Sequence, residues 1–228
     1  MYGRVFVWTS LIATVLHAGD PRNFQVSLEN CSEVIGTSQI PVARVVNLVP
    51  STFQIAGGES GFATLVVRAG LCRKASVDGA PQEEARVAQV GVVVIPPDGT
   101  GGINSYTLFY ATNSLRLTAR LELSGLPVSL DPDLVYEVTP DPAGSGGEFL
   151  FDVSPPLSQA WYLSGSVSDP VGPQFPFVAN WWYGLRTGRL KMATPIPSLS
   201  YGGGSVRVYS RRESLVGGLI EETHSHLM

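Results

Sequence analysis

The chain has 228 residues, of which 44% are hydrophobic and 15% are charged, and its net charge at pH 7 is -4. Ordinary globular domains carry about 25% charged residues. This composition excludes an intrinsically disordered chain and a protein that follows nucleic-acid phosphates with a basic surface. The length allows one or two domains, and β-barrels of this size commonly form a single one.

The first 18 residues are predicted to be a secretory signal peptide. A short basic segment ends at Arg4, an almost unbroken apolar run covers residues 5–16, and a small residue follows at Ala18. Leaders that are cleaved at a small residue have this pattern, and the run is shorter than the about 20 residues of a membrane helix. Because no later segment is suited to span a bilayer, we expect cleavage after Ala18 and a soluble protein that is secreted or periplasmic. A buried first strand over residues 5–15 is the alternative.

Two cysteines, Cys31 and Cys72, follow the predicted leader. In an oxidising compartment, two cysteines in a mature chain usually form a disulfide, so export predicts a Cys31–Cys72 bridge. Two buried thiols that behave as small apolar residues are the alternative. Asn30 begins an Asn-Cys-Ser glycosylation sequon, but a bridge at its middle residue would work against modification.

A short helix is predicted after the mixed polar segment of residues 23–36, to which no element is assigned. Pro41 suits the first turn of a helix, and Pro50 ends one. Valines at positions 42, 45, 46 and 49 recur at helical spacing between the two prolines, so they share one face. The pattern predicts one helical element over residues 42–49.

Three strands are predicted next, over residues 62–71, 85–95 and 105–111, because these runs are rich in β-branched and apolar residues. Turn signals separate them, namely an Asp-Gly pair after Val77 and the Pro-Pro-Asp-Gly sequence at 96–99. The run over residues 85–95 is apolar at nearly every position. Strands that are buried on both faces, or that line a filled interior, have this character.

The segment 115–123 fits two interpretations. Leucines alternate with other residues along it, which favours a strand. Its residues are also strong helix formers, with Asn113 or Ser114 as a cap at the start and Gly125 and Pro127 as stop signals at the end. The residue pattern alone leaves both open.

The second half of the chain is predicted to be a series of short strands. Apolar and β-branched runs indicate strands over residues 134–138, 148–153, 159–167, 178–183, 188–193 and 205–209. Residues 214–220 fit a helical turn or a strand, and residues 221–228 form a polar, flexible tail. Many short strands with regular turns predict a mainly β sandwich or barrel, in a single domain over residues 19–220.

No complete catalytic or metal-binding set is found in the sequence. His17 lies in the predicted leader, and His224 and His226 lie in the tail, so a histidine base for acyl transfer is not expected. His224 and His226 are a candidate metal pair, but no second cluster completes a zinc site, and a solvated tail is the simpler interpretation. No metal and no cofactor are predicted.

Basic residues gather most densely over residues 186–191, directly after the aromatic residues 181–183. Aromatic and basic side chains together bind single-stranded nucleic acid in some proteins. The negative net charge and the expected export argue against a nucleic-acid partner here. We expect the aromatic residues to pack in a core or to line a cavity.

Three segments together resemble the acetoacetate decarboxylase family. Residues 38–53, from Ser-Gln-Ile-Pro to Leu-Val-Pro-Ser-Thr-Phe, look like that family's early strand, short helix and Val-Pro turn. Residues 86–94 look like its central strand, which carries a pocket glutamate. Residues 106–127, which end in Ser-Gly-Leu-Pro, look like the strand, crossing helix and Gly-x-Pro-Lys turn that presents the family's Schiff-base lysine.

The resemblance covers residues 38–129, with a looser β continuation beyond them. It implies a closed or partly closed antiparallel β-barrel with two short helices, one of them over residues 115–123. The family's reaction needs a lysine of lowered pKa that attacks a ketone. This chain has Val128 at the position of that lysine, Gln89 at the pocket glutamate and Gln39 near the early arginine. Schiff-base decarboxylation is therefore not expected.

The resemblance also implies an apolar barrel interior as the binding site. The expected ligand contacts are Gln39, Gln89, Tyr106, Tyr110, Val128 and Trp161. Two further aromatic residues, Trp181 and Trp182, are expected walls of this interior. Ordinary core packing is the alternative for each of these residues.

Three hypotheses of function remain open. The first is a secreted barrel that binds a small, largely apolar molecule without Schiff-base chemistry, either alone or as a homo-oligomer. The second is a lyase, cyclase or isomerase that uses the same cavity, with Glu122 or Tyr110 as its acid or base. The third is a structural β domain with a filled core.

Overall fold

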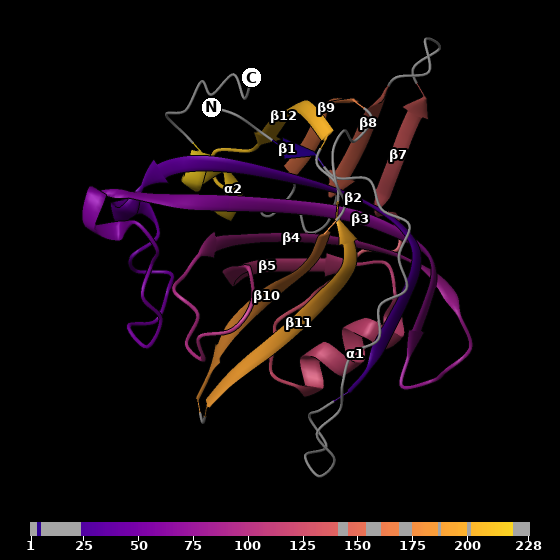
Figure 1. The fold of residues 1–228 in the computed structure, drawn as a ribbon, viewed down its shortest axis with the longest axis horizontal. Coiled ribbons are helices and arrows are strands. Elements are labelled where there is room, and N and C mark those ends of the chain that lie inside the picture. The colour runs from indigo at the N-terminus through magenta and orange to yellow at the C-terminus, as the bar shows by residue number, and fades with distance from the viewer. Residues whose placement is uncertain are drawn as a thin grey trace.

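The described part of the chain forms two β-sheets, two α-helices and two short 3₁₀ helices (Figure 1). This computed structural model describes residues 4–5, 24–140, 146–153, 161–168, 175–186, 188–199 and 202–220. The expected mainly β class with two short α-helices is confirmed.

The larger sheet has the strand order β11-β10-β5-β4-β3-β2, with β6 beside β5. Its strands are β2 (Val26–Pro41), β3 (Phe62–Val77), β4 (Glu83–Val93), β5 (Ile103–Thr112), β6 (Ser129–Leu130), β10 (Phe175–Leu185) and β11 (Gly188–Leu199). Strands β2 to β5 and the pair β10–β11 are antiparallel, whereas β5 is parallel to both β10 and β6.

The smaller sheet has the order β1-β12-β9-β8-β7, and all its neighbours are antiparallel. Its strands are β1 (Arg4–Val5), β12 (Gly202–Ser210), β9 (Trp161–Ser168), β8 (Gly146–Val153) and β7 (Val135–Pro140). This sheet supplies the layer that covers one face of the larger one.

Among the described residues, neither sheet closes on itself. The hydrogen-bonded order of the larger sheet ends at β11 and β2, and that of the smaller sheet ends at β1 and β7. Figure 1 shows the larger sheet strongly twisted, so that β10 and β11 run steeply across the direction of β2 and β3. The described architecture is therefore two packed sheets in which β5 is parallel to two of its neighbours, and the expected closed or partly closed antiparallel barrel is not confirmed.

The two faces of the larger sheet pack against different partners, because side chains alternate between the faces of a strand. On β4, Val90 belongs to the core shared with the smaller sheet, which includes Trp161. On the other face of the same strand, Val87 packs with Leu117 and Leu121 of α1. The larger sheet is thus buried on both faces, as the nearly continuous apolar run of β4 predicts.

The segment that fits both strand and helix forms α1 (Leu115–Leu123). Ser114 caps the helix, since its hydroxyl accepts a hydrogen bond from the Leu117 amide at 3.1 Å. Leu117 and Leu121 are buried one turn apart, whereas Leu115 and Leu123 are exposed. The alternation of leucines in the sequence therefore does not produce a strand. Only Leu117 and Leu121 are buried in a core, and their spacing of four residues is that of one helical turn.

Two local predictions are corrected. No element was predicted for residues 23–36, but from Val26 onward they belong to β2. This strand pairs with β3 along nearly its full length. The helix expected over residues 42–49 is only a 3₁₀ turn, Val42–Arg44, followed by further turns. Four β-branched valines in eight residues lower the helix propensity there. The remaining helical elements are the 3₁₀ turn Gly58–Ser60 and α2 (Leu215–Ile220).

Most of the predicted leader and the whole predicted tail, residues 221–228, lie outside the described residues. Of residues 1–18, the structure describes Arg4 and Val5, which form β1 and pair with β12. Export and cleavage therefore stay predictions.

The structure contains the predicted Cys31–Cys72 disulfide. The two cysteines are direct partners on β2 and β3, with their Cα atoms 4.0 Å apart, and both are buried. The bridge ties β2, which ends the larger sheet, to its neighbour.

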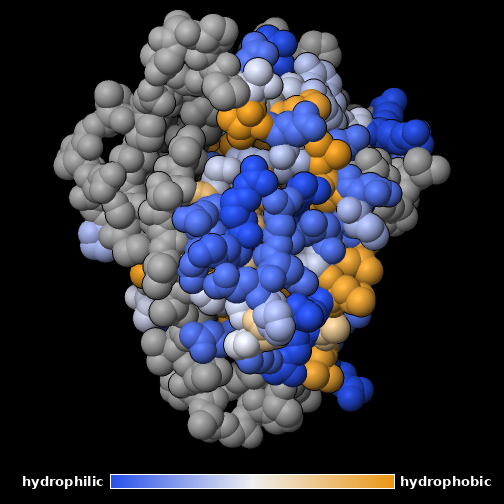
Figure 2. Space-filling model, turned by 90° about the vertical axis from the view of Figure 1, so that its right-hand side faces the viewer, coloured by the Kyte–Doolittle hydropathy of each residue, from blue (hydrophilic) through white to orange (hydrophobic). Residues whose placement is uncertain are grey.

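The apolar side chains of the chain gather mainly in the two cores on either side of the larger sheet. The face of the molecule shown in Figure 2 is mostly hydrophilic where its residues are described, with smaller hydrophobic areas near its right margin. Among the described residues, no helix combines the length and the hydropathy that crossing a membrane requires.

Candidate functional site

Four polar side chains form a buried group on the α1 side of the larger sheet. Arg68 on β3 is the direct partner of Gln89 on β4, and Gln89 is the direct partner of Tyr110 on β5. Direct partners in antiparallel strands share a face. Glu33 on β2 joins them from the edge of the sheet. We call Glu33, Arg68, Gln89 and Tyr110 the interior polar cluster.

Arg68 holds the interior polar cluster together. Its Nε donates to Oε2 of Glu33 at 3.0 Å, its Nη2 donates to Oε1 of Glu33, and its Nη1 donates to Oε1 of Gln89 at 2.6 Å. Glu33 is 5% exposed, Arg68 6% and Gln89 1%. A two-pronged ion pair of this kind is the geometry in which a carboxylate compensates a buried guanidinium best.

Both ionisable neighbours of Glu33 keep their protons at neutral pH. Burial works to lower the pKa of Arg68, but the charge and hydrogen bonds of Glu33 outweigh it and raise that pKa. Burial raises the pKa of Tyr110 to about 12, against the opposing effect of the Arg68 charge. Tyr110 is thus an uncharged phenol at neutral pH, which argues against a role as a catalytic base.

A β-bulge brings a further polar group to the same face. The register between β4 and β5 shifts between Val90 and Gly91, after which Gly91 is the partner of Thr107. Because of this shift, Thr107 and Tyr110 share a face although they are three residues apart. The Thr107 hydroxyl is buried and has no hydrogen-bond partner among the described residues.

Gly91 leaves room for an indole ring beside Thr107. A Cβ atom at Gly91 would lie 2.7 Å from the Trp181 ring and 2.5 Å from the Tyr106 carbonyl oxygen. Trp181 is therefore packed directly over β4, as expected for a wall residue. A side chain larger than glycine at this position would displace it.

Tyr110 connects the interior polar cluster to a group of buried apolar side chains on the same face of the sheet. They come from β3, β4, β5, α1 and the turn after it, and comprise Val77, Val87, Leu117, Leu121 and Leu126 with Tyr110. Val128 and Met192 pack against this group from its margin. The structure thus brings together three of the predicted contacts, Gln89, Tyr110 and Val128, in one layer between the sheet and α1.

The other predicted site residues lie elsewhere. Gln39 is exposed and donates to the Thr64 hydroxyl at 2.8 Å. Tyr106 packs on Phe53, with ring centroids 5.0 Å apart, in the core on the opposite face. Trp161 lies in that same core. The resemblance placed these residues in one interior, but Tyr106 lies on the face of the sheet opposite to Gln89, and side chains on opposite faces cannot share a pocket. Gln39 lies on the same face of β2 as Glu33, but six positions further along the strand.

Glu122, the second candidate acid or base, lies on the outer, exposed side of α1. Leu117 and Leu121 occupy the inner side of the helix. A side chain that faces the solvent is not held against a buried ligand. Glu122 is therefore not part of the layer that contains Gln89.

Glu33, Arg68 and Thr107 are functional candidates that the sequence patterns did not single out. Arg68 is the one charge inside the apolar run of β3, and a charge in such a run signals a buried partner. Glu33 lies in the segment without periodicity, so no pattern links it to Arg68. Thr107 depends on a bulge that leaves no clear mark in the sequence.

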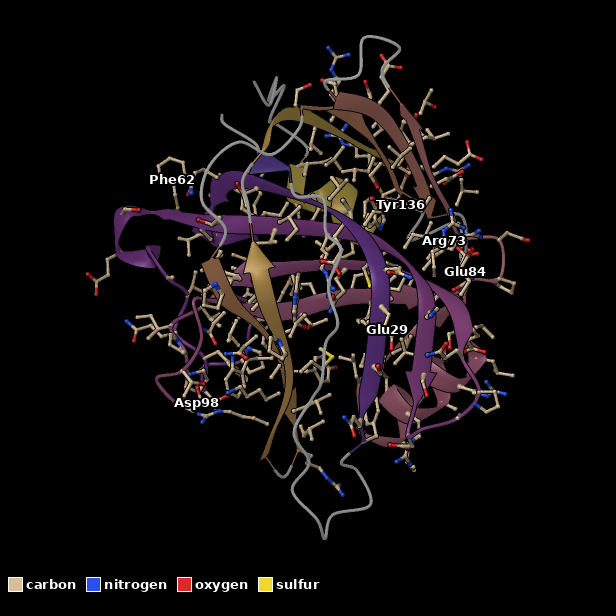
Figure 3. The ribbon with its side chains drawn as sticks, turned by 45° about the vertical axis from the view of Figure 1, so that its right-hand side comes forward. Glu29, Phe62, Arg73, Glu84, Asp98 and Tyr136 are labelled. Carbon is tan, nitrogen blue, oxygen red and sulfur yellow. A yellow bond between two sulfur atoms is a disulfide. The ribbon has the colours of Figure 1, made fainter. Side chains whose placement is uncertain are left out.

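Neither lysine of the chain lies in this layer. Lys191 donates to Asp98 Oδ2 and to the Thr100 hydroxyl, both at 2.6 Å. The hydrogen bond from Lys191 lowers the pKa of Asp98 to about 2. Figure 3 places Asp98 at the end of the sheet opposite to Arg73 and Glu84. Lys74 lies 3.7 Å from Glu29 at the surface.

The described residues contain no group of three or more metal-ligating side chains. All three histidines, His17, His224 and His226, lie outside the described residues. A separate hollow of about 360 Å³ lies beside α2, lined by Ser210, Arg212, Gly217 and Ile220. It shares no residue with the interior polar cluster.

No protein-family model and no curated protein matches the chain. Among solved structures, the chain is similar to an acetoacetate decarboxylase from Legionella pneumophila subsp. pneumophila strain Philadelphia 1. The two are 9% identical, the comparison covers 96% of this chain and 76% of that chain, and the TM-score is 0.48. At this identity, the role of each residue has to be derived from its own contacts in this chain.

Proposed function

We propose that this chain is a binding protein for a small, largely apolar molecule, and that it works without Schiff-base chemistry. The ligand occupies the layer between strands β3 to β5 and α1. The observation that carries this proposal is the convergence of a few polar groups in an otherwise apolar, buried layer, which is how small-molecule sites are built. The buried Thr107 hydroxyl, without a partner among the described residues, is a group that such a ligand would satisfy.

Access to this layer requires α1 to move outward, because Gln89 and Tyr110 are both buried. The helix has nine residues, too few to be stable without its packing. Two surface ion pairs hold it, Arg120 with Asp78 at 2.7 Å and Arg116 with Glu83 at 3.4 Å. Partly exposed pairs contribute at most about 1 kcal/mol each, so these pairs present only a small barrier to the opening of α1.

Binding is tested with a series of apolar molecules of four to ten carbon atoms, by calorimetry and by the shift of the unfolding temperature. We expect Gln89→Leu and Thr107→Val each to weaken binding about tenfold, since each removes one hydrogen bond worth roughly 1–1.5 kcal/mol. Gln39→Leu and Thr64→Val are matched controls, because this exposed Gln–Thr pair lies on β2 and β3 outside the layer. If the control variants weakened binding as much as the test variants, the ligand would have to bind outside this layer.

Failure of every compound to bind would instead favour the hypothesis of a structural β domain. In that case the polar groups of the layer would serve only to fix the register of the strands. Hydrogen exchange of α1 supplies a second readout, because a bound ligand should protect its amides while those of the outer strand β7 stay unchanged.

Treatment with a β-keto acid and borohydride should leave the mass of the protein unchanged. Val128 supplies no amine at the turn after α1. The amine of Lys191 is engaged by Asp98 and Thr100 at 2.6 Å each and lies outside the layer. Intact-mass spectrometry checks the result, with a Schiff-base enzyme as the positive control. A reduced adduct on Lys74 or Lys191 would overturn the exclusion of imine chemistry.

An acid–base enzyme is supported less well. Its two candidates are separated, since Glu122 is exposed on α1 and Tyr110 is buried beneath it with a pKa of about 12. We also propose that the protein is exported, on the pattern of residues 1–18. The buried Cys31–Cys72 disulfide is compatible with an oxidising compartment.

A further inference from the structure

We infer that the ligand of this layer is electrically neutral, with an apolar body and one acceptor oxygen, as in a ketone, an aldehyde or an alcohol, and that carboxylates are excluded. The inference rests on the proposed binding function and specifies the chemical class of its ligand. Two features of the interior polar cluster carry it: the balance of its charges and the hydrogen-bond donors that remain.

The charges of the interior polar cluster already cancel. Arg68 and Glu33 form a two-pronged ion pair, and both are more than nine-tenths buried. The other members and their neighbour, Gln89, Tyr110 and Thr107, are uncharged at neutral pH. A carboxylate ligand would therefore add a negative charge with no partner, and an uncompensated buried charge is strongly unfavourable.

The donors in the layer suit an acceptor oxygen. A guanidinium has five N–H groups, and the three bonds from Arg68 to Glu33 and Gln89 engage three of them. Two N–H groups of Arg68 are not used by these bonds, and the Thr107 hydroxyl has no partner among the described residues. A carbonyl or hydroxyl oxygen accepts from such donors without bringing a charge.

The surrounding side chains suit the rest of such a molecule. Leu117 and Leu121 from α1, Val87 from β4 and Leu126 from the following turn are all buried hydrocarbon. Each methylene group of a ligand that is buried against them adds to the affinity. We therefore expect the alkyl part of the ligand to supply the affinity. The oxygen group decides whether a neutral compound or a carboxylate is bound.

The test compares two molecules of the same shape and different charge, 2-heptanone and hexanoate, by calorimetry at pH 7. In the ketone, a methyl group stands where the carboxylate has its second oxygen. We expect the unmodified protein to bind the ketone at least about 100-fold more tightly than hexanoate. This comparison needs no variant, so it decides the inference even if substitutions impair folding.

Glu33→Gln reverses the balance of charge with little change of shape, since it leaves Arg68 with an uncompensated positive charge. We expect this variant to gain affinity for hexanoate by at least tenfold and to lose the preference for the ketone. Glu29→Gln is the matched control: Glu29 lies on the same strand, pairs with Lys74 at the surface and is labelled in Figure 3. It should leave the preference unchanged.

The outcomes separate the two claims. Tight binding of hexanoate by the unmodified protein would overturn the inference of a neutral ligand and leave the binding function standing. Equal responses of Glu33→Gln and Glu29→Gln would also overturn it, because the preference would then not depend on the buried charge. Absence of binding by every neutral and anionic compound would overturn the proposed function itself, and the inference with it.

Discussion

Replacing Glu33 by leucine should lower the free energy of unfolding by about 3–5 kcal/mol. The substitution leaves the guanidinium of Arg68 only 6% exposed and without its carboxylate. A buried charge that loses its partner pays the cost of leaving water without compensation. Urea unfolding followed by tryptophan fluorescence measures the change.

Removing both charges should cost much less than removing one. In the double variant Glu33→Leu/Arg68→Met, no charge is buried, so we expect it to recover more than half of the stability lost in Glu33→Leu. The surface control Glu29→Leu breaks the exposed pair with Lys74 and should change stability by about 1 kcal/mol or less. Additive losses in the double variant would show that Glu33 and Arg68 are not coupled.

Loss of the Cys31–Cys72 disulfide should lower the free energy of unfolding by about 2–4 kcal/mol. The bridge joins residues 41 positions apart and so restricts the unfolded chain. It also ties β2, which pairs only with β3 within the described order of the larger sheet, to its neighbour. Urea unfolding with and without a strong reductant measures the effect.

The variant Cys31→Ala/Cys72→Ala provides the control for this measurement. Its stability should match that of the reduced protein and should not respond to the reductant. Glu33 lies on the same face of β2 as Cys31, because the two are separated by two positions. We therefore expect Glu33→Leu to cost less once the bridge is absent, since β2 is then less firmly held. If the free energy of unfolding of the wild-type protein were the same with and without the reductant, the bridge would not be stabilising.

Strand positions were largely predictable because strands here have a local signature. The run over residues 85–95 predicted a strand buried on both faces, and β4 (Glu83–Val93) is packed against a core on each side. Gln89, which this run carries, is buried as well, at 1% exposed. In both cases the information lies within about ten consecutive residues.

The first part of β2 was not predictable in this way. Its residues alternate irregularly between polar and apolar, because Cys31 and Glu33 are buried by specific partners and not by their hydrophobicity. Those partners, Cys72 and Arg68, lie 41 and 35 positions further along the chain. A residue that is polar in the sequence and buried in the fold gives a misleading local pattern.

The interior polar cluster shows why site residues were only partly found. Gln89, Tyr110 and Val128 were predicted together, and they do share a layer. Tyr106 was predicted with Tyr110, but the bulge between Val90 and Gly91 moves Thr107 to the inner face and Tyr106 to the opposite one. A single inserted residue reverses the face of every side chain beyond it.

By itself, the sequence determined the β class and the position of most strands, since the pattern of each strand lies within one segment. The tertiary structure alone decided that residues 115–123 are a helix, that β5 and β10 run parallel, and that Glu33 neutralises Arg68. The physical reason is the same in each case. These features depend on which distant side chains become neighbours, and that free energy is not contained in any local stretch of the chain.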